Sequence, residues 1–313
     1  MSTKKIIKRS QPQAAVERIG LLGLGIMGSA MADNLIKAGF LVYGFDPSAK
    51  ARQQLNRSGG KPCHDADEVI QSVEVVITSL PSAAALLESA NTLARVGHKG
   101  LLVIETSTLD IQDKLTARDC MAKRGVVLLD CPLSGTGAQA KRKDLTVYAS
   151  GPSGSIRRLK PVFEGFSKAH FDLGVFGNGM KMKLMANLLV AIHNVSTAEA
   201  LLLGQRWGIS PKKAVEVLSD GAGGSRMLQV RGPMMENEGW TEATMKVSVW
   251  QKDMKLIAQA LADAQVPAPL FAATVPLYNA AIGLGHAEND TAAVFDVLSR
   301  MSSAPKKRVS TKR

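Results

Sequence analysis

Three glycines at the end of an apolar run have the spacing of a phosphate-binding turn. Residues 19–22 predict a buried strand, and Gly23, Gly25 and Gly28 follow it before a helical segment. Gly23 permits a tight turn, Gly25 lets the main chain approach a pyrophosphate, and Gly28 lets the helix pack close to the strand. Amide groups at the start of such a helix favour an anion. We therefore predict a dinucleotide site made by these glycines and the first helical residues, Ile26 and Met27.

An acidic residue, Asp46, closes the second predicted strand at residues 40–45 and lies 23 residues after the first glycine. A carboxylate at that point accepts hydrogen bonds from the ribose hydroxyls of the adenosine and repels a 2′-phosphate. This position favours NAD over NADP as the cofactor. Lys50 and Arg52 lie just beyond Asp46 and could soften that preference, so NADP stays open.

The chain shows no pattern for a metal site, a disulfide framework or a membrane span. Its three cysteines, Cys63, Cys120 and Cys131, lack ligand spacing, and its five histidines are scattered. No uninterrupted apolar run reaches the roughly 18 residues that a spanning helix needs. We expect reduced thiols in a cytoplasmic protein, without a metal and without a membrane segment.

The positive charge is concentrated at the two ends of the chain. Residues 1–17 and 302–313 together hold eight of the formal net charge of +12. Both segments lack apolar periodicity, which predicts disordered basic tails. The folded body is only mildly basic, and the tails lack interleaved aromatic residues for base stacking. Charge therefore argues against nucleic acid as the main partner.

Periodicity divides the remaining 18–301 into two parts. Residues 18–177 alternate short apolar runs with helix-length segments, which predicts a Rossmann-type doubly wound, mostly parallel sheet of the α/β class. Residues 178–301 predict an all-helical second domain, beginning with one long proline-free helix at 180–207. Further strands are predicted at 74–80, 101–104, 126–130 and 145–149, with helices at 47–58, 211–220, 225–236, 243–263, 267–284 and 290–300.

Polar and turn residues follow several predicted strands. They are Leu80 and Pro81 after one strand, Thr108 after the next, and Ser134 after the third. Ligands of open α/β sheets bind beyond the carboxyl ends of the strands. We expect these loops to line the cofactor cleft.

The motifs together resemble the β-hydroxyacid dehydrogenases, the family of 3-hydroxyisobutyrate dehydrogenase and tartronate semialdehyde reductase. The glycine turn continues through Met31-Ala32, Asn34-Leu35, Lys37 and Gly39 as in that family. The run from Asp130 to Thr136 is similar to the family's D-A-P-V-S-G-G substrate loop. Two further matches are Gly177-x-Gly179-x-x-x-Lys183-x-x-x-Asn187, which resembles the catalytic-lysine helix, and the pair Lys252-Asp253.

This resemblance implies a role for each matching residue. It implies that Lys183 relays a proton and that Asn187 orients Lys183 or the substrate oxygen. It implies substrate carboxylate binding by Ser134, Gly135, Thr136 and Lys252, and dinucleotide contacts from Leu80, Pro81, Thr108 and Lys252.

The physical chemistry of Lys183 agrees with that role. Residues four apart on a helix share a face, so Lys183 and Asn187 point the same way. A lysine at the start of the interdomain helix can reach the cleft between the domains. Partial burial beside Lys252 and an oxidised, cationic nicotinamide would lower its pKa towards neutrality, where it can exchange protons.

Two positions depart from the family pattern. Thr136 stands where the family has a second glycine, and Ala186 replaces the first asparagine of an N-N pair. Both changes alter hydrogen-bonding groups near the predicted pocket, and such groups decide which analogues a pocket rejects. The resemblance therefore implies the chemistry and leaves the substrate open.

We predict an NAD(P)-dependent oxidoreductase that interconverts a small 3-hydroxy acid and its semialdehyde or keto form, as a homodimer or homotetramer. One alternative is an imine-reductase-like enzyme, a class that usually carries another residue at the position of Lys183. The other is a non-catalytic dehydrogenase-like binding module whose basic tails contact nucleic acid, although such relatives tend to lose the lysine.

Overall fold

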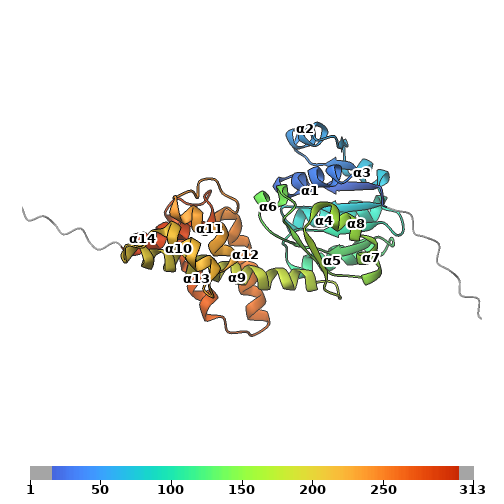
Figure 1. Cartoon of the computed structure of the whole chain (residues 1–313). Helices are drawn as coiled ribbons and strands as arrows, with labels where there is room; N and C mark the ends of the chain where they lie inside the picture. Colours follow the sequence, from blue (N-terminus) through green and yellow to red (C-terminus); the bar gives the residue numbers. More distant parts are fainter. Residues whose placement is uncertain (1–15, 303–313) are drawn as a thin grey trace, which may run out of the picture.

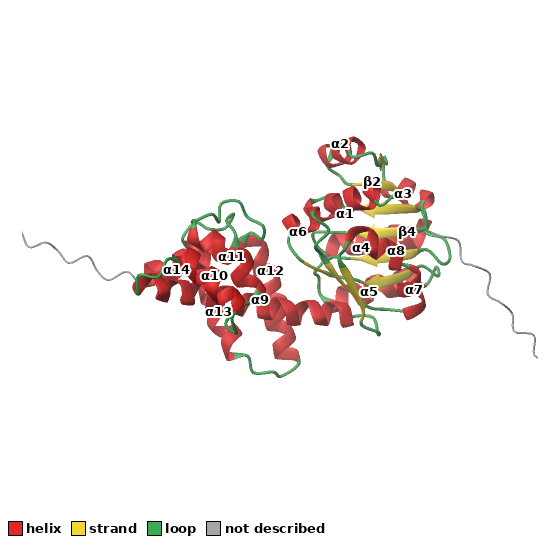
Figure 2. Cartoon of the chain, viewed as in Figure 1, coloured by secondary structure: helices red, strands yellow, loops and turns green. Residues whose placement is uncertain are grey.

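A computed structural model describes residues 16–302, which form two lobes joined by one long helix (Figure 1). One lobe contains both β-sheets, and the other is entirely helical apart from its loops (Figure 2). The predicted tails at 1–17 and 302–313 lie outside the described residues except at their inner ends.

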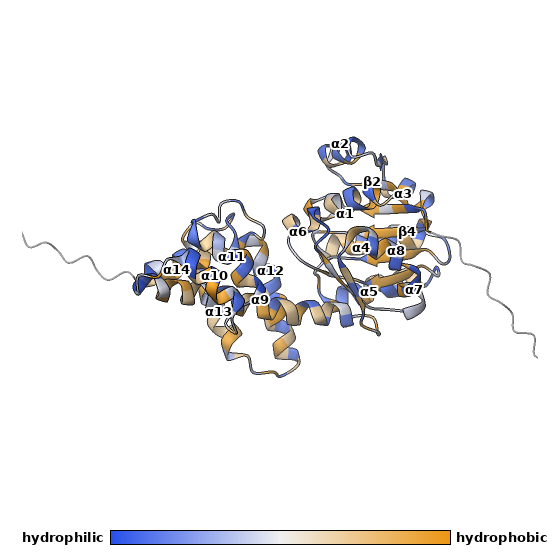
Figure 3. Ribbon diagram, in the orientation of Figure 1, coloured by the Kyte–Doolittle hydropathy of each residue, from blue (hydrophilic) through white to orange (hydrophobic). Residues whose placement is uncertain are grey.

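The first lobe is built on a six-stranded parallel sheet in the order β3-β2-β1-β4-β5-β6. In this order the sheet grows to one side from β1 to β3 and to the other side from β4 to β6, so the strand order reverses between β1 and β4, where dinucleotides bind in doubly wound folds. The central strands are buried, because helices cover both faces of the sheet. Their residues are hydrophobic and are coloured orange in Figure 3. The predicted Rossmann-type fold is confirmed. The strands are β1 (Arg18–Leu22), β2 (Leu41–Phe45), β3 (Lys61–Pro62), β4 (Val75–Thr78), β5 (Leu102–Glu105) and β6 (Val127–Asp130).

The helices of this lobe begin at side-chain caps that the sequence supplies. Ser48, Asp65, Ser82 and Asp110 each accept a hydrogen bond from an amide of the first turn. The helix after β1 differs, because its cap is Gly25 and no side chain covers its amides. The helices are α1 (Ile26–Lys37), α2 (Ala49–Arg57), α3 (Ala66–Ser72), α4 (Ala83–Val96) and α5 (Ile111–Ala122).

A second, three-stranded sheet corrects one expectation. The run at 145–149 was expected in the main sheet, but it forms β8 (Thr146–Ala149) in a separate sheet of order β7-β8-β9. Pro132 cannot donate an amide to extend the main ladder, and Asp130 pairs with Ser150 only as an isolated antiparallel bridge. The remaining elements are β7 (Leu133–Ser134), α6 (Gly137–Lys141), α7 (Ser153–Arg158), α8 (Lys160–Phe166) and β9 (Ala169–Asp172).

The helical lobe closely follows the predicted segments. One helix begins later than expected, at Val247 rather than 243, because the amides of Thr244 and Met245 bind the buried Asp290 carboxylate. Asp290 also pairs with buried Arg231. The helices are α9 (Asn178–Arg206), α10 (Pro211–Asp220), α11 (Arg226–Glu236), α12 (Val247–Asp263), α13 (Pro269–Gly283), a short 3₁₀ turn η1 (Thr291–Ala293) and α14 (Val294–Met301).

Helix α9 connects the two lobes and forms the centre of the helical lobe. It leaves the first lobe at Gly177, whose φ of +95° starts the helix, and α10 to α14 pack around its later turns. By length and composition alone, α9 could cross a membrane, and its most apolar window is 39% buried inside the protein. Its buried face carries the polar residues Lys183, Asn187 and Asn194. These features are those of a core helix that also reaches the space between the lobes.

Candidate functional site

The three glycines of the turn have different roles: two are required by close packing, and the third leaves open space beside the main chain. A Cβ at Gly23 would lie 2.2 Å from the carbonyl oxygen of Ser79, and one at Gly28 would lie 2.0 Å from the carbonyl oxygen of Gly23. Both positions therefore require glycine for the fold itself. A Cβ at Gly25 would meet nothing within 4 Å. The open space beside Gly25, at the uncapped start of α1, fits a pyrophosphate approaching the main chain.

Asp46 is fixed beside that turn. Its Oδ2 accepts the amide of Leu24 at 2.8 Å, and its Oδ1 accepts the amide of Ser48 at 2.8 Å. Each carboxylate oxygen keeps a further lone pair for a hydroxyl donor such as a ribose. The Arg52 guanidinium donates to the main-chain carbonyl of Asp46 and lies 5.7 Å from the centre of the Phe45 ring.

The loops after β4 and β5 lie beside the glycine turn. The amide of Leu80 donates to Ser107 Oγ at 2.8 Å, which links the two loops, and Pro81 follows as an exposed residue. The Leu80 side chain lies 3.6 Å from the point where a Cβ would stand on Gly23. The carbonyl of Thr108 accepts a hydrogen bond from Lys252 Nζ of the helical lobe. This contact joins the two lobes.

The loop after β6 reaches the same region. Ser134 ends β7, and Gly135 has a φ of +133°, where a Cβ would lie 2.6 Å from Leu145 Cδ2. Thr136 caps α6: its hydroxyl accepts the Gln139 amide, and the Gln139 side-chain oxygen accepts the Thr136 amide. The Thr136 hydroxyl is thus used locally by the helix.

The same loop also abuts the glycine turn. A Cβ at Gly137, the first residue of α6, would lie 2.5 Å from Ile26 Cγ2, so the end of this loop and the start of α1 are in contact. Ile26 is 74% exposed, while Met27, the next residue of α1, packs against the core.

Helices α9 and α12 bring four polar residues together. Lys183, Asn187 and Asp253 are 9%, 4% and 5% exposed, respectively. Asn187 Nδ2 donates to Asp253 Oδ2 at 2.9 Å, and Lys252 Nζ lies 3.3 Å from Asp253 Oδ1. Within residues 16–302, no hydrogen bond or ion pair reaches the Lys183 ammonium. A buried lysine in this state is available to a ligand.

The surroundings of Lys183 lower its pKa from the ordinary lysine value. Burial is the largest cause, since it penalises the ammonium. The Asp253 carboxylate opposes this effect and raises the pKa, whereas the Lys252 ammonium lowers it further. A lysine whose pKa is lowered releases its proton more readily than an ordinary lysine, which suits a group that exchanges protons with a ligand.

Sequence reasoning gave no role to two residues of this site. Asp253 holds Asn187, and its burial follows from the spacing of Trp250, Asp253 and Ile257 along one face of α12. Ser107 joins the loops of Leu80 and Thr108, and no pattern in the sequence signals that bond. Ser134 and Lys183 are not hydrogen-bonded to each other in the described part of the chain, although α9 contacts β7.

Known proteins match this chain along nearly all of its described length. Residues 18–177 match the family described as the NAD binding domain of 6-phosphogluconate dehydrogenase. Residues 177–298 match the family described as NAD-binding of NADP-dependent 3-hydroxyisobutyrate dehydrogenase.

Individual relatives cover both lobes. An L-threonate dehydrogenase of Cupriavidus necator is 31% identical, with 89% of this chain and 95% of the relative covered. An NAD-dependent L-serine dehydrogenase of Pseudomonas aeruginosa is 30% identical, with coverages of 89% and 97%. The crystal structure of 3-hydroxyisobutyrate dehydrogenase from Salmonella typhimurium has a TM-score of 0.81 at 26% identity, covering 90% of this chain and 99% of that one.

Proposed function

The chain belongs to the β-hydroxyacid dehydrogenase family of NAD(P)-dependent oxidoreductases, and from that premise we propose that its substrate is a small 3-hydroxy acid or the corresponding semialdehyde. Lys183 is the general acid and base of the proposed reaction. The observation that carries this proposal is the burial of Lys183, without a partner among the described residues, beside Asn187 and Asp253.

The proposed roles follow from the charge that each residue offers. In oxidation the hydroxyl proton of the substrate passes to Lys183 Nζ, and in reduction Lys183 returns it to the carbonyl oxygen. The dinucleotide, when bound, accepts or supplies the hydride. Asn187, held by Asp253, orients Lys183 or the substrate oxygen.

We place the substrate carboxylate between Ser134, Gly135 and Lys252. The Ser134 hydroxyl, the loop amides and the Lys252 ammonium all favour an anion. Thr136 shapes the pocket mainly through its bulk, because α6 uses its hydroxyl. The residues that would hold the dinucleotide are Gly23, Gly25, Gly28, the first residues of α1 and Asp46. The loops of Leu80, Pro81 and Thr108 would contact it from the side.

A turnover screen tests the proposal. The wild-type chain is mixed with NAD or NADP and with 3-hydroxyisobutyrate, glycerate, 3-hydroxypropionate, L-threonate or L-serine, and nicotinamide absorbance is followed. The last two compounds are included because they appear in the names of relatives. We expect turnover of at least one of the five compounds in the screen. Bound cofactor with no turnover of any hydroxy acid or semialdehyde would contradict the proposal.

We propose that the enzyme prefers NAD because of Asp46. Replacing Asp46 with serine removes a negative charge next to the place of a 2′-phosphate, and one charge pair at about 4 Å contributes roughly 1–4 kcal/mol. The efficiency with NADP relative to NAD should therefore rise about tenfold or more. Steady-state kinetics with both cofactors measure that ratio, and an unchanged ratio would mean that Asp46 does not set the preference.

Two variants should move the pH profile of oxidation in opposite directions. Oxidation needs neutral Lys183, so the rate rises with pH through the Lys183 pKa. Asp253 raises this pKa, so Asp253→Asn should move the rising limb to lower pH. Lys252 lowers the pKa, so Lys252→Met should move the limb to higher pH. Profiles of kcat/KM against pH measure both shifts, and movement in the same direction would exclude Lys183 as the titrating group.

We propose that the functional unit is a homodimer or homotetramer, because α9 exposes an apolar stripe. Met185, Leu189, Leu203 and Trp207 are 61%, 50%, 49% and 71% exposed on one side of the helix. The charge pattern of the stripe suits a two-fold axis. Lys181 and Glu199 lie at similar distances on either side of Leu189 and Ile192, so antiparallel copies of α9 would pair the lysine of one with the glutamate of the other.

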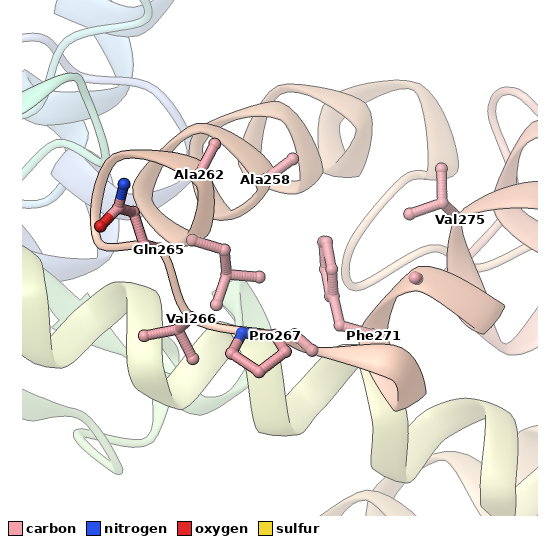
Figure 4. A pocket seen from close by; sticks show the side chains of 10 residues that line it. Ala258, Ala262, Gln265, Val266, Pro267, Phe271 and Val275 are labelled. Carbon is pink, nitrogen blue, oxygen red and sulfur yellow. The ribbon is translucent and has the colours of Figure 1, made fainter.

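A second apolar surface offers the further contact that a homotetramer needs. No charged residue occurs from 264 to 284, the segment that links α12 to α13 and contains the whole of α13. A groove of about 600 Å³ runs between these helices (Figure 4). Charge-poor apolar surfaces of this kind are typical of protein interfaces. Its lining includes Ala258, Leu261, Val266, Pro267, Phe271 and Val275.

Charge exchange tests the α9 contact. Lys181→Glu or Glu199→Lys alone should place like charges opposite each other and lower the mass of the oligomer in sedimentation velocity. The double variant should restore the wild-type mass, because the pairs re-form with reversed sign. Single variants that sediment like the wild type would remove α9 from the interface.

We also propose a cytoplasmic location, because all three cysteines are free and form no disulfide among the described residues. Two of them, Cys63 and Cys131, are buried, and burial raises the pKa of the Cys63 thiol to about 11. Such thiols are poorly reactive, as expected for structural cysteines in a reducing compartment.

A further inference from the structure

A buried ion triad lies outside the site described above. Lys114 of α5 is fully buried, and its Nζ lies 2.6 Å from Glu105 Oε2 and 2.8 Å from Asp130 Oδ1. Both carboxylate side chains are 0% exposed. Glu105 ends β5 and Asp130 ends β6, so Lys114 bridges the carboxyl ends of two neighbouring strands.

Glu105 connects the triad to the loops that we propose to contact the cofactor. Glu105 Oε1 accepts the amide of Ser107 at 2.9 Å. The hydroxyl of Ser107 in turn accepts the amide of Leu80 at 2.8 Å. Thr108, the next residue, receives Lys252 from the helical lobe. One carboxylate thus holds the loop that touches both the Leu80 loop and Lys252.

The Asp130 arm leads to the start of α9. Asp130 Oδ2 accepts the amide of Met180 at 2.8 Å, and the amide of Gly179 donates to Ser150 Oγ at 2.9 Å. The helix is pressed onto these strands, because a Cβ at Gly179 would lie 2.3 Å from the carbonyl oxygen of Tyr148. Lys183 follows Met180 within one turn. A carboxylate at this end also suits the helix dipole.

The charge of Lys114 is necessary for this arrangement. Burial lowers the pKa of Lys114, but Glu105 and Asp130 together outweigh that effect and raise it, so the ammonium persists. Without it, two carboxylates would face each other in a dry interior, where like charges cannot both stay ionised. One of them would take up a proton or turn away from its amide.

We propose that Lys114 is a positioning residue that fixes the first turn of α9, and with it Lys183, relative to the loop after β5. The effect of Lys114 on the position of α9 is inferred from the hydrogen bonds and ion pairs described above. Its effect on turnover rests on the proposed function of Lys183. Lys114 touches neither substrate nor cofactor, and it acts through Asp130 and Glu105.

The test compares Lys114→Met with the double variant Lys114→Met/Glu105→Gln. The single variant leaves two unpaired buried carboxylates and can fail to fold. The double variant keeps the net charge of the wild-type triad but lacks the bridge. Hydrogen–deuterium exchange of peptides covering residues 178–184 reports on the start of α9, and steady-state kinetics report on turnover.

In the double variant we expect faster exchange at the start of α9 and a fall in kcat of about 10- to 100-fold, the scale of a misplacement of about 1 Å. KM and the Kd for NADH should change far less, because the side-chain oxygen of a glutamine at position 105 can still accept the Ser107 amide and hold that loop. Wild-type exchange would overturn the proposal, and so would wild-type kcat in a variant with faster exchange. If the wild-type protein shows no turnover of any substrate, the proposed function fails, and exchange alone still decides whether Lys114 holds α9.

Discussion

Replacing Lys183 with methionine is expected to lower kcat by about 10²- to 10⁴-fold in both directions, the usual contribution of a positioned general acid and base. Methionine fills a similar volume without a titratable group, and no ion pair among the described residues depends on Lys183. The fold and the affinity for NADH should therefore persist. Single-turnover absorbance measurements with saturating cofactor separate the chemical step from binding.

A second lysine supplies the control for Lys183→Met. Lys255 is exposed on α12, two residues after Asp253, and makes no ion pair within residues 16–302. Lys255→Met should retain wild-type kcat. Should Lys183→Met also turn over at the wild-type rate, another group moves the proton and the role proposed for Lys183 is wrong.

Replacing Gly25 with aspartate is expected to weaken cofactor binding strongly and leave the fold intact. The new Cβ would meet nothing within 4 Å, so packing does not oppose the side chain. Its carboxylate would stand where the pyrophosphate approaches, and a like-charge contact of this kind costs several kcal/mol. We expect a loss in NADH affinity of about 10²- to 10³-fold. Titration of nicotinamide fluorescence measures the Kd.

Gly154→Asp is the matched control for Gly25→Asp. Gly154 lies in α7 with open space around its Cβ position, so it accepts the same change away from the cleft. The two variants should have similar melting temperatures, and only Gly25→Asp should lose NADH. Retention of wild-type affinity by Gly25→Asp would place the pyrophosphate elsewhere.

The parts of the fold that the sequence predicts well are those governed by local pattern. Apolar runs bounded by turns correspond to β1, β2 and β4 to β6, and three- and four-residue spacing corresponds to α9 to α14. The one misplaced strand, β8, has the same local pattern as the others. Its partner is chosen by the chain reversal at Pro132 and the bridge from Asp130 to Ser150, which no local pattern encodes.

The same distinction applies to the site. Lys183 and Asn187 share a helix face by spacing alone, and both are buried. Contacts between segments that are distant in the sequence cannot be predicted from local pattern. These contacts are Asn187 with Asp253, Lys252 with Thr108, and Lys114 with Asp130. The capping box that Thr136 forms with Gln139 is visible in the sequence as Thr-x-x-Gln, whereas a place for Thr136 beside the substrate stays a prediction.

The central claim is direct hydride transfer between a hydroxy acid and the nicotinamide. The most direct measurement incubates the wild-type chain with NAD and a 3-hydroxy acid, identified by the turnover screen, that carries deuterium on its carbinol carbon. Mass spectrometry of the NADH formed then locates the label. We predict one deuterium in the NADH and none in the solvent. Unlabelled NADH, or no NADH with any substrate of the screen while cofactor is bound, would contradict direct hydride transfer.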